Sequence, residues 1–175
     1  IKFQKDDITL KELYDYNPIE LYVKCVNVSK QCSIHFNYKT HPDMSVTKLL
    51  LMTTTLPIFF RPQKYKDEYY VDGGLSGNLP VEKIKSKNVL CIHIKRCMKN
   101  LDEEAIPLLG FLQNMCSVSS LSYNKYKKST INIVIDLSTY DFNIDKNKKN
   151  KIIKMGYEQT LKRLNDKNFN YNPKH

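Results

Sequence analysis

The stretch from Tyr69 to Val81 constrains the fold of this chain most strongly. It reads Tyr-Tyr-Val-Asp-Gly-Gly-Leu-Ser-Gly-Asn-Leu-Pro-Val. The run that ends at Asp72 has the composition of a β-strand, two glycines follow it directly, and Asn78-x-Pro80 is typical of the start of a helix. Glycine allows neighbouring groups to approach the backbone closely. The stretch therefore predicts a carboxylate at the end of a strand, held on a tight turn.

Asp72 has two interpretations. An Asp-Gly pair is a common turn signal, because the carboxylate bonds to the backbone nearby. A carboxylate fixed at the end of a strand is also a candidate general base. The turn alone does not separate these interpretations, so the flanking sequence has to decide between them.

The flanking sequence resembles the patatin-like phospholipase family. Four segments carry the resemblance: 39–46, 52–62, 69–72 and 78–81. The first is similar to the family's segment leading into a helix, and the second to its small-residue, apolar, Pro, Phe, Pro stretch. The third is similar to its Tyr-Val-Asp strand end, and the fourth to its Asn-x-Pro-hydrophobic continuation. The resemblance covers residues 1–165 and is strongest over 42–81.

The resemblance implies an acyl hydrolase with a serine–aspartate dyad. In it Asp72 would be the catalytic base, and Gly73 and Gly74 would form the active-site loop. The serine would attack an ester carbonyl of a phospholipid or another acyl ester, and water would release the fatty acid from the acyl-enzyme. A free aspartate, with a pKa of about 3.9, is a poor base, so we expect burial to raise the pKa of Asp72.

The nucleophile that the resemblance requires has no match. The family's serine stands in Gly-x-Ser-x-Gly, on a strained turn. Of the five glycines, at positions 73, 74, 77, 110 and 156, no pair brackets a serine at that spacing. The stretch Gly74-Leu75-Ser76-Gly77 is one residue too short for this pattern, and we interpret Ser76 as a loop serine. We expect the serine and the oxyanion loop in a missing N-terminal half, and this chain alone to be inactive.

Other titratable residues compete less well for the role of base. Asp136 follows a strand-like run but no glycine follows it, Asp43 is expected to cap a helix, and Asp141 is expected in an exposed loop. Among the histidines, His93 lies inside an apolar run and His175 in the polar tail. The histidines predict no catalytic triad.

The cysteines do not indicate a metal site. There are five, at positions 25, 32, 91, 97 and 116. An odd number without compact spacing favours reduced thiols and an intracellular location. The spacing of Cys25, Cys32, His35 and His41 matches no common zinc site, and strand alternation places His35 opposite Cys32. We therefore predict neither a metal nor a cofactor.

The net charge of +10 suggests an anionic partner. The lysines over 146–154 are the nearest approach to a basic patch, and we expect them to favour an anionic membrane surface. No run of about 18 apolar residues predicts a membrane-spanning helix. An alternative function is a non-catalytic basic module that binds anionic lipid or nucleic acid. The Asp72 turn favours the hydrolase, and no nucleic-acid-binding motif is recognisable.

Periodicity predicts an α/β fold, a partial patatin-like sandwich with a mostly parallel sheet flanked by helices. We expect one domain over residues 1–165 and a loose polar tail over 166–175. Strands are predicted over 20–28, 32–38, 69–71, 89–94 and 131–137. Lys66-Asp67 is expected to form the turn of a short hairpin that leads into the strand 69–71. Thr9 and Glu12 have the spacing of a helix-capping box.

Helices are predicted after Thr9, after Asp43, at Asn78, over 106–126 and after Asp145. The strands 89–94 and 131–137 are mainly apolar, which predicts burial on both faces. The helix after Asp43 is expected to bury Val46, Leu49, Leu50 and Thr53. The last helix is expected to bury Ile153, Tyr157, Thr160 or Leu161, and Leu164.

Overall fold

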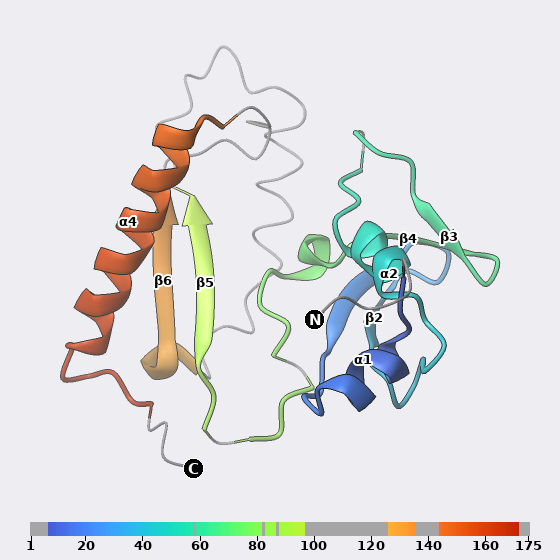
Figure 1. Cartoon of the computed structure of the whole chain (residues 1–175), viewed down its shortest axis with the longest axis horizontal. Helices are drawn as coiled ribbons and strands as arrows, with labels where there is room; N and C mark the ends of the chain where they lie inside the picture. The colour runs from blue at the N-terminus through green and yellow to red at the C-terminus, as the bar shows by residue number, and fades with distance from the viewer. Residues whose placement is uncertain are drawn as a thin grey trace. The chain divides into compact units, whose positions relative to one another are not determined.

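The computed structural model describes residues 7–57, 59–81, 83–86, 88–96, 126–135 and 144–171. The chain divides into two compact units (Figure 1). Unit 1 comprises residues 1–83 and 113–120, and unit 2 comprises residues 84–112 and 121–175. Helices and strands occur in both, in agreement with an α/β fold. A single domain over residues 1–165 stays a prediction.

Unit 1 contains a four-stranded sheet in which every neighbouring pair is antiparallel. The strands are β1 (Val23–Asn27), β2 (Cys32–Phe36), β3 (Gln63–Tyr65) and β4 (Glu68–Asp72). They lie side by side in the order β2-β1-β4-β3. The prediction of a mostly parallel sheet is therefore wrong. Residues 28–31 alone connect β1 to β2, and a parallel pair needs a crossover of a dozen residues or more.

The turn between β3 and β4 consists of Lys66 and Asp67, as the sequence predicted. Both residues adopt positive φ, 47° and 62°. Two consecutive positive φ values give a twist that matches the flanking strands of a hairpin. The turn therefore sets the register that places Tyr70 opposite Gln63.

One helix precedes the β1–β2 hairpin of unit 1, and another follows it. Helix α1 (Leu10–Tyr16) starts at the predicted capping box, in which Thr9 and Glu12 bond to each other's backbone N–H. Helix α2 (Val46–Thr53) is capped by Ser45, whose side chain accepts a hydrogen bond from the Lys48 N–H. The prediction that Asp43 caps this helix is wrong. The helix begins two residues later than expected, and Asp43 is exposed.

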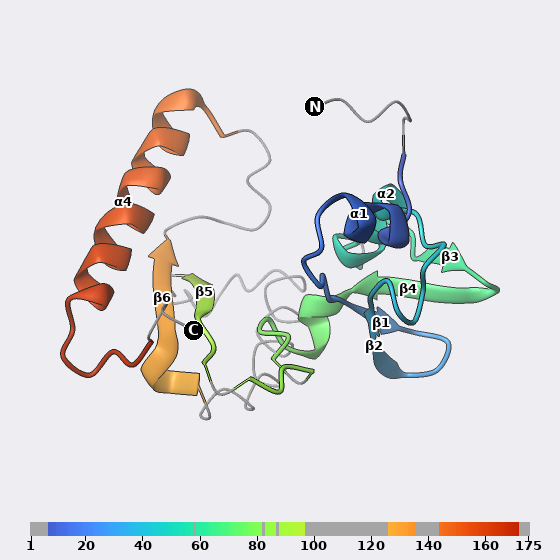
Figure 2. The same ribbon diagram turned by 60° about the horizontal axis from the view of Figure 1, so that its bottom comes forward.

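The core of unit 1 lies between the sheet and these two helices, which lie on the same side of it (Figure 2). It consists of Leu10, Cys25, Phe36, Met44, Leu49, Met52 and Tyr70. Within it the ring of Phe36 meets Tyr70 edge to face, with centroids 5.6 Å apart. Helix α2 buries Leu49 and Met52 and exposes Leu50, so the expected inward position of Leu50 is wrong.

A single 3-10 turn, η1 (Gly73–Ser76), follows β4 directly. The helix predicted at Asn78 does not form in the described residues 78–81 and 83–86. The turn ends at Gly77, which has a φ of 121°. This backbone conformation is open to glycine and stops the helical turn before Asn78.

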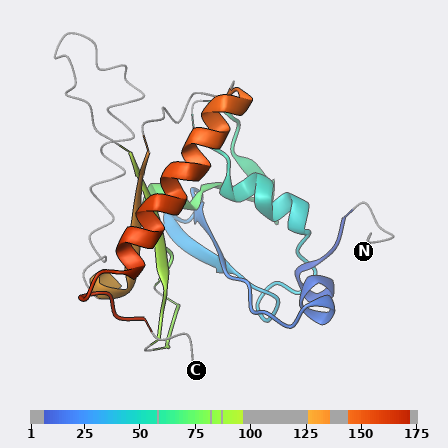
Figure 3. The ribbon, with the colours of Figure 1, turned by 60° about the vertical axis from the view of Figure 1, so that its left-hand side comes forward.

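Unit 2 contains a parallel pair of strands and one long helix (Figure 3). Strand β5 (Cys91–Arg96) pairs with β6 (Thr130–Ile135), and α4 (Lys146–Leu164) lies along β6. Asp145 caps α4, as the sequence predicted. The helix predicted over 106–126 falls outside the described residues except for Tyr126.

Arg163, near the end of α4, forms hydrogen bonds at the start of β6. Its guanidinium donates hydrogen bonds to the carbonyl oxygens of Lys127, Lys128 and Thr130. It also lies over the Phe169 ring, 5.2 Å from the centroid. The described part of the tail therefore contacts the rest of unit 2, whereas the sequence predicted a loose segment.

The inward face of α4 differs from the expected one. Gly156 faces Ile133 of β6, and the Gln159 side chain bonds to the backbone N–H and C=O of Val134. The expected inner stripe is instead 42–70% exposed and comprises Ile153, Tyr157, Leu161 and Leu164. These four residues are named the α4 stripe below.

Strand β5 is also less covered than its composition predicted. Ile92 and Ile94 are more than half exposed, so burial of this strand on both faces is wrong for the described structure. Cys91 and Ile131 are buried. Among the described residues, no helix has the length and apolar character needed to cross a membrane.

Candidate active site

Asp72 is the last residue of β4 and the N-cap of η1. Its backbone N–H donates to the carbonyl oxygen of Thr55 at 2.9 Å. Its carboxylate Oδ1 accepts a hydrogen bond from the Gly74 N–H at 2.7 Å. Strand pairing on one side and the turn on the other thus fix both the backbone and the side chain of Asp72.

The surroundings of Asp72 favour proton acceptance. Burial raises the pKa of the Asp72 carboxyl, and the hydrogen bond from Gly74 opposes that rise. Cys25, its partner in β1, is fully buried, and burial raises the pKa of its thiol to about 12. A carboxyl with a raised pKa is a better general base near neutral pH than a free aspartate.

Glycine is required at both positions after Asp72, because neighbouring atoms lie too close to leave room for a Cβ. A Cβ on Gly73 would collide with the carbonyl oxygen of Lys24 in β1. A Cβ on Gly74 would lie 2.7 Å from Asn78 Oδ1 and 3.1 Å from Asp72 Oδ1. Positive φ occurs only later in the turn, at Gly77. The glycines therefore let the turn fold directly against β1.

The Asp72 carboxylate lines an open hollow of about 310 Å³ in unit 1. Its lining residues are Tyr22, Val23, Lys24, Thr53, Asp72, Gly73, Gly74, Gly77, Asn78 and Pro80. A hydroxyl brought into this hollow could lose its proton to Asp72. Ser76 is already engaged, since its hydroxyl donates to the Gly73 carbonyl at 3.1 Å and accepts from Ser33 at 2.7 Å.

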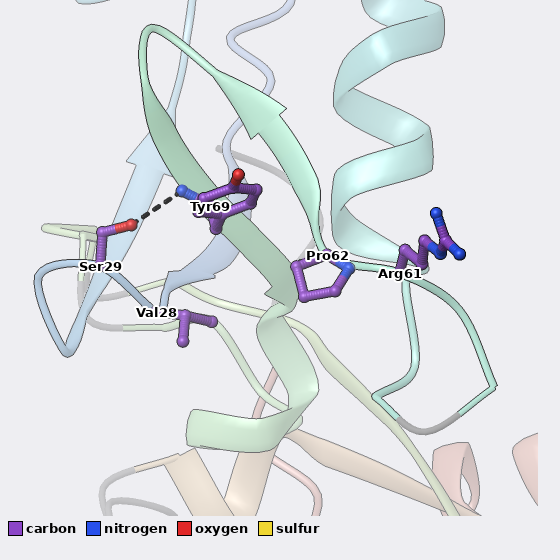
Figure 4. Close-up of a pocket in the computed structure, with 5 residues that line it drawn as sticks. All are labelled: Val28, Ser29, Arg61, Pro62 and Tyr69. Carbon is purple, nitrogen blue, oxygen red and sulfur yellow. Dashed lines mark hydrogen bonds between the residues drawn. The ribbon is translucent and has the colours of Figure 1, made fainter.

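A second hollow lies near the other end of β4 and is mainly apolar (Figure 4). Its lining comprises Val28, Ser29, Arg61, Pro62 and Tyr69. Ser29 Oγ accepts a hydrogen bond from the Tyr69 N–H, and Arg61 points away from the other side chains. No carboxylate or imidazole lines it, so the hollow at Asp72 remains the candidate for catalysis.

Of the other sequence candidates, the structure describes Asp43 and His93. Asp136, Asp141 and His175 fall outside the described residues. Asp43 is exposed, and His93 is half-buried on β5 in unit 2. The parts of the chain that the structure describes contain no group of three or more His, Cys, Asp or Glu side chains arranged to hold a metal.

Sequence reasoning missed two residues next to the turn. Lys24 is 6% exposed and lines the same hollow as Asp72. Thr53 donates a hydrogen bond to the Lys24 carbonyl oxygen at 2.8 Å. The available signal was a lysine in the middle of a strand whose neighbours, Val23 and Cys25, are apolar.

Comparison with known proteins gives two matches. The sequence pattern described as patatin-like phospholipase matches residues 6–84, which include Asp72 and the turn. A second match is the probable lipid hydrolase 463L of Invertebrate iridescent virus 6, 30% identical over 136 residues. The aligned region is 78% of this chain and 44% of that relative, so the chain spans less than half of the relative's length.

These two matches support a patatin-like family for this chain. The resemblance predicted from residues 42–81 is thereby confirmed. The roles of individual residues are a separate question, because neither match states what Asp72, Gly73 or Gly74 does.

Proposed function

We propose that this chain contributes the general base of a lipid acyl hydrolase of the phospholipase or lysophospholipase type, and that this base is Asp72. The observation that carries the proposal is a half-buried carboxylate with a raised pKa, fixed at the mouth of a hollow. The names of the two matches, a patatin-like phospholipase and a probable lipid hydrolase, support lipid esters as the substrate class.

In this proposal the nucleophilic serine comes from an upstream segment of the protein. The Asp72 carboxylate accepts the serine proton while the serine oxygen attacks the ester carbonyl. The protonated Asp72 then gives that proton to the departing alcohol. In the second half Asp72 accepts a proton from the water that attacks the acyl-enzyme. The protonated Asp72 then gives this proton to the departing serine oxygen, which releases the fatty acid and restores both residues.

The test is Asp72→Asn in the protein that carries the predicted serine segment. Asparagine keeps the shape and the acceptor for the Gly74 N–H but cannot take a proton. General bases contribute about 10²–10⁴-fold, so we expect kcat to fall by about a thousandfold. The measurement is phospholipid and p-nitrophenyl ester hydrolysis, with circular dichroism to establish folding.

Two rival aspartates supply matched controls for that experiment. Asp43→Asn and Asp136→Asn should both retain activity within about twofold. Wild-type activity in folded Asp72→Asn would reduce Asp72 to a turn residue. The 175-residue chain alone should hydrolyse neither ester, since the oxyanion donors are expected upstream and one such donor contributes about 10²-fold. Turnover by this chain alone would contradict the upstream serine.

We also propose that α4 contacts an anionic membrane surface. Six lysines and one arginine accompany a single glutamate in this helix, and the α4 stripe adds exposed apolar side chains. Basic amphipathic helices of this kind lie in the membrane interface. Each lysine near the surface contributes up to about 1 kcal/mol with anionic lipid.

Vesicle sedimentation tests this second proposal. Binding to anionic vesicles should exceed binding to neutral ones and should weaken as salt rises, because exposed charges are screened. Tyr157→Asp should weaken binding at every salt concentration, since it places a charge in the apolar stripe. Single-stranded and duplex DNA are titrated in parallel. Tight binding to either, without preference for anionic vesicles, would instead support the basic interaction module.

A further inference from the structure

Lys24 is a charged residue in the interior of unit 1. It is the second residue of β1 and is 6% exposed. Burying an ammonium group is unfavourable unless it is hydrogen-bonded. Its Nζ donates to the carbonyl oxygen of Ser76 at 3.1 Å and lies 3.5 Å from that of Gly77. These two carbonyls are at the end of the turn that begins at Asp72.

The backbone of Lys24 contacts the beginning of the same turn. Its carbonyl oxygen lies so close to Gly73 that a Cβ at Gly73 would collide with it. Thr53 donates a hydrogen bond to that oxygen and holds it in place. Lys24 therefore contacts η1 at both ends, with its main chain at Gly73 and its side chain at Ser76 and Gly77.

We infer that Lys24 is a positioning residue for the Asp72 carboxylate, an inference that rests on the function proposed for Asp72. The Gly74 N–H bonds to the carboxylate and lies inside the segment that Lys24 holds at both ends. Loss of the ammonium frees the end of the turn, which moves the Gly74 N–H and with it the carboxylate. The lysine itself acts on Asp72 only through the turn.

The experiment replaces Lys24 in the protein that carries the predicted serine segment. Lys24→Met keeps the length and apolar stem of the side chain and removes the charge and the donors. A shift of about 1 Å in a catalytic group costs up to about 10²-fold, so we expect kcat to fall about 10- to 100-fold with KM within twofold. The acidic limb of the pH profile should also move, because the Gly74 hydrogen bond influences the pKa of Asp72.

Lys24→Gln provides a graded variant that retains an N–H donor without the charge. The expected order of kcat is wild type, Lys24→Gln, then Lys24→Met. If Lys24→Met does not fold, Lys24→Gln carries the test alone. Ser33→Ala is the control, because it removes a bond to the Ser76 side chain and leaves the Lys24 contacts in place. It should keep kcat within about twofold.

The outcomes separate this inference from the function on which it rests. Wild-type kcat and an unchanged pH profile in a folded Lys24 variant would overturn the role of Lys24, even when Asp72→Asn is inactive. Full activity in Asp72→Asn would overturn both. A melting temperature that falls while kcat and the pH profile stay at wild-type values would show that Lys24 contributes to stability alone.

Discussion

Helices α2 and α4 each pack against strands, but of these two helices only α2 has buried residues. Helix α2 contacts both β1 and β4 and buries Met52 completely. Helix α4 lies along β6 and leaves Ile153 70% exposed. The candidate base lies in unit 1, beside the covered helix. A catalytic side chain needs such rigid support, whereas an uncovered apolar stripe suits contact with another surface.

The largest contrast between the two units is expected at their glycines. Gly73→Ala places a Cβ against the fixed carbonyl oxygen of Lys24, and the backbone must move. We expect a loss of more than about 4 kcal/mol in the free energy of unfolding, among the largest for single substitutions. Urea unfolding and hydrogen exchange of β1 and β4 amides measure this loss.

Gly156→Ala in α4 is the matched control. Its Cβ would lie 3.9 Å from Ile133, an ordinary contact, and alanine favours helix by about 1 kcal/mol over glycine. We expect equal or greater protection of α4 amides from exchange. Equal effects of the two substitutions would mean that the turn at Gly73 is loose.

A second contrast compares apolar side chains in α2 and α4. Met52→Ala should lower the free energy of unfolding of unit 1 by about 3 kcal/mol, because it leaves a cavity in the core. Ile153→Ala should change the stability of unit 2 by less than about 0.5 kcal/mol, as for most exposed positions. Hydrogen exchange resolves the two helices separately. A large loss for Ile153→Ala would show that the α4 stripe is covered in the free chain.

The smallest contrast concerns pH and two aspartates of unit 1. The raised pKa of Asp72 means that the folded chain holds its proton more tightly than the unfolded chain. Stability from this group is therefore lost as pH rises from the ordinary value of 3.8 through the folded pKa. Asp72→Asn should gain in urea midpoint relative to wild type over this range.

Asp67→Asn, at the tip of the β3–β4 hairpin, is the control for the pH experiment. Its side chain is 94% exposed, so this variant removes a carboxylate that lies outside the hollow. A midpoint difference between Asp72→Asn and wild type that stays constant with pH would contradict a raised pKa for Asp72.

Local signals predicted the elements around the site well. The Thr9 capping box, the Lys66-Asp67 turn and the strand ending at Asp72 are all confirmed. Each depends on the chemistry of neighbouring residues, which a single sequence displays. The roles of Asp72, Gly73 and Gly74 remain predictions that mutagenesis must test.

The predictions from sequence were wrong where contacts between distant segments determine the structure. The parallel sheet was inferred from alternating elements, whereas the short links in unit 1 impose antiparallel pairing. The inner face of α4 was assigned to its most apolar residues, but Gly156 and Gln159 face β6 instead. Lys24 was missed because its significance comes from a turn fifty residues away in sequence.

Alkylation of the buried Cys25 thiol can measure how often the pairing of β1 with β4, which holds Asp72, opens. With no exposed surface and a pKa of about 12, it should react with alkylating reagents only during transient opening of β1 and β4. Cys32, exposed at the start of β2, should react without such opening and provides an internal reference. The ratio of the two labelling rates would report the lifetime of the assembled turn in solution without any substitution in the site.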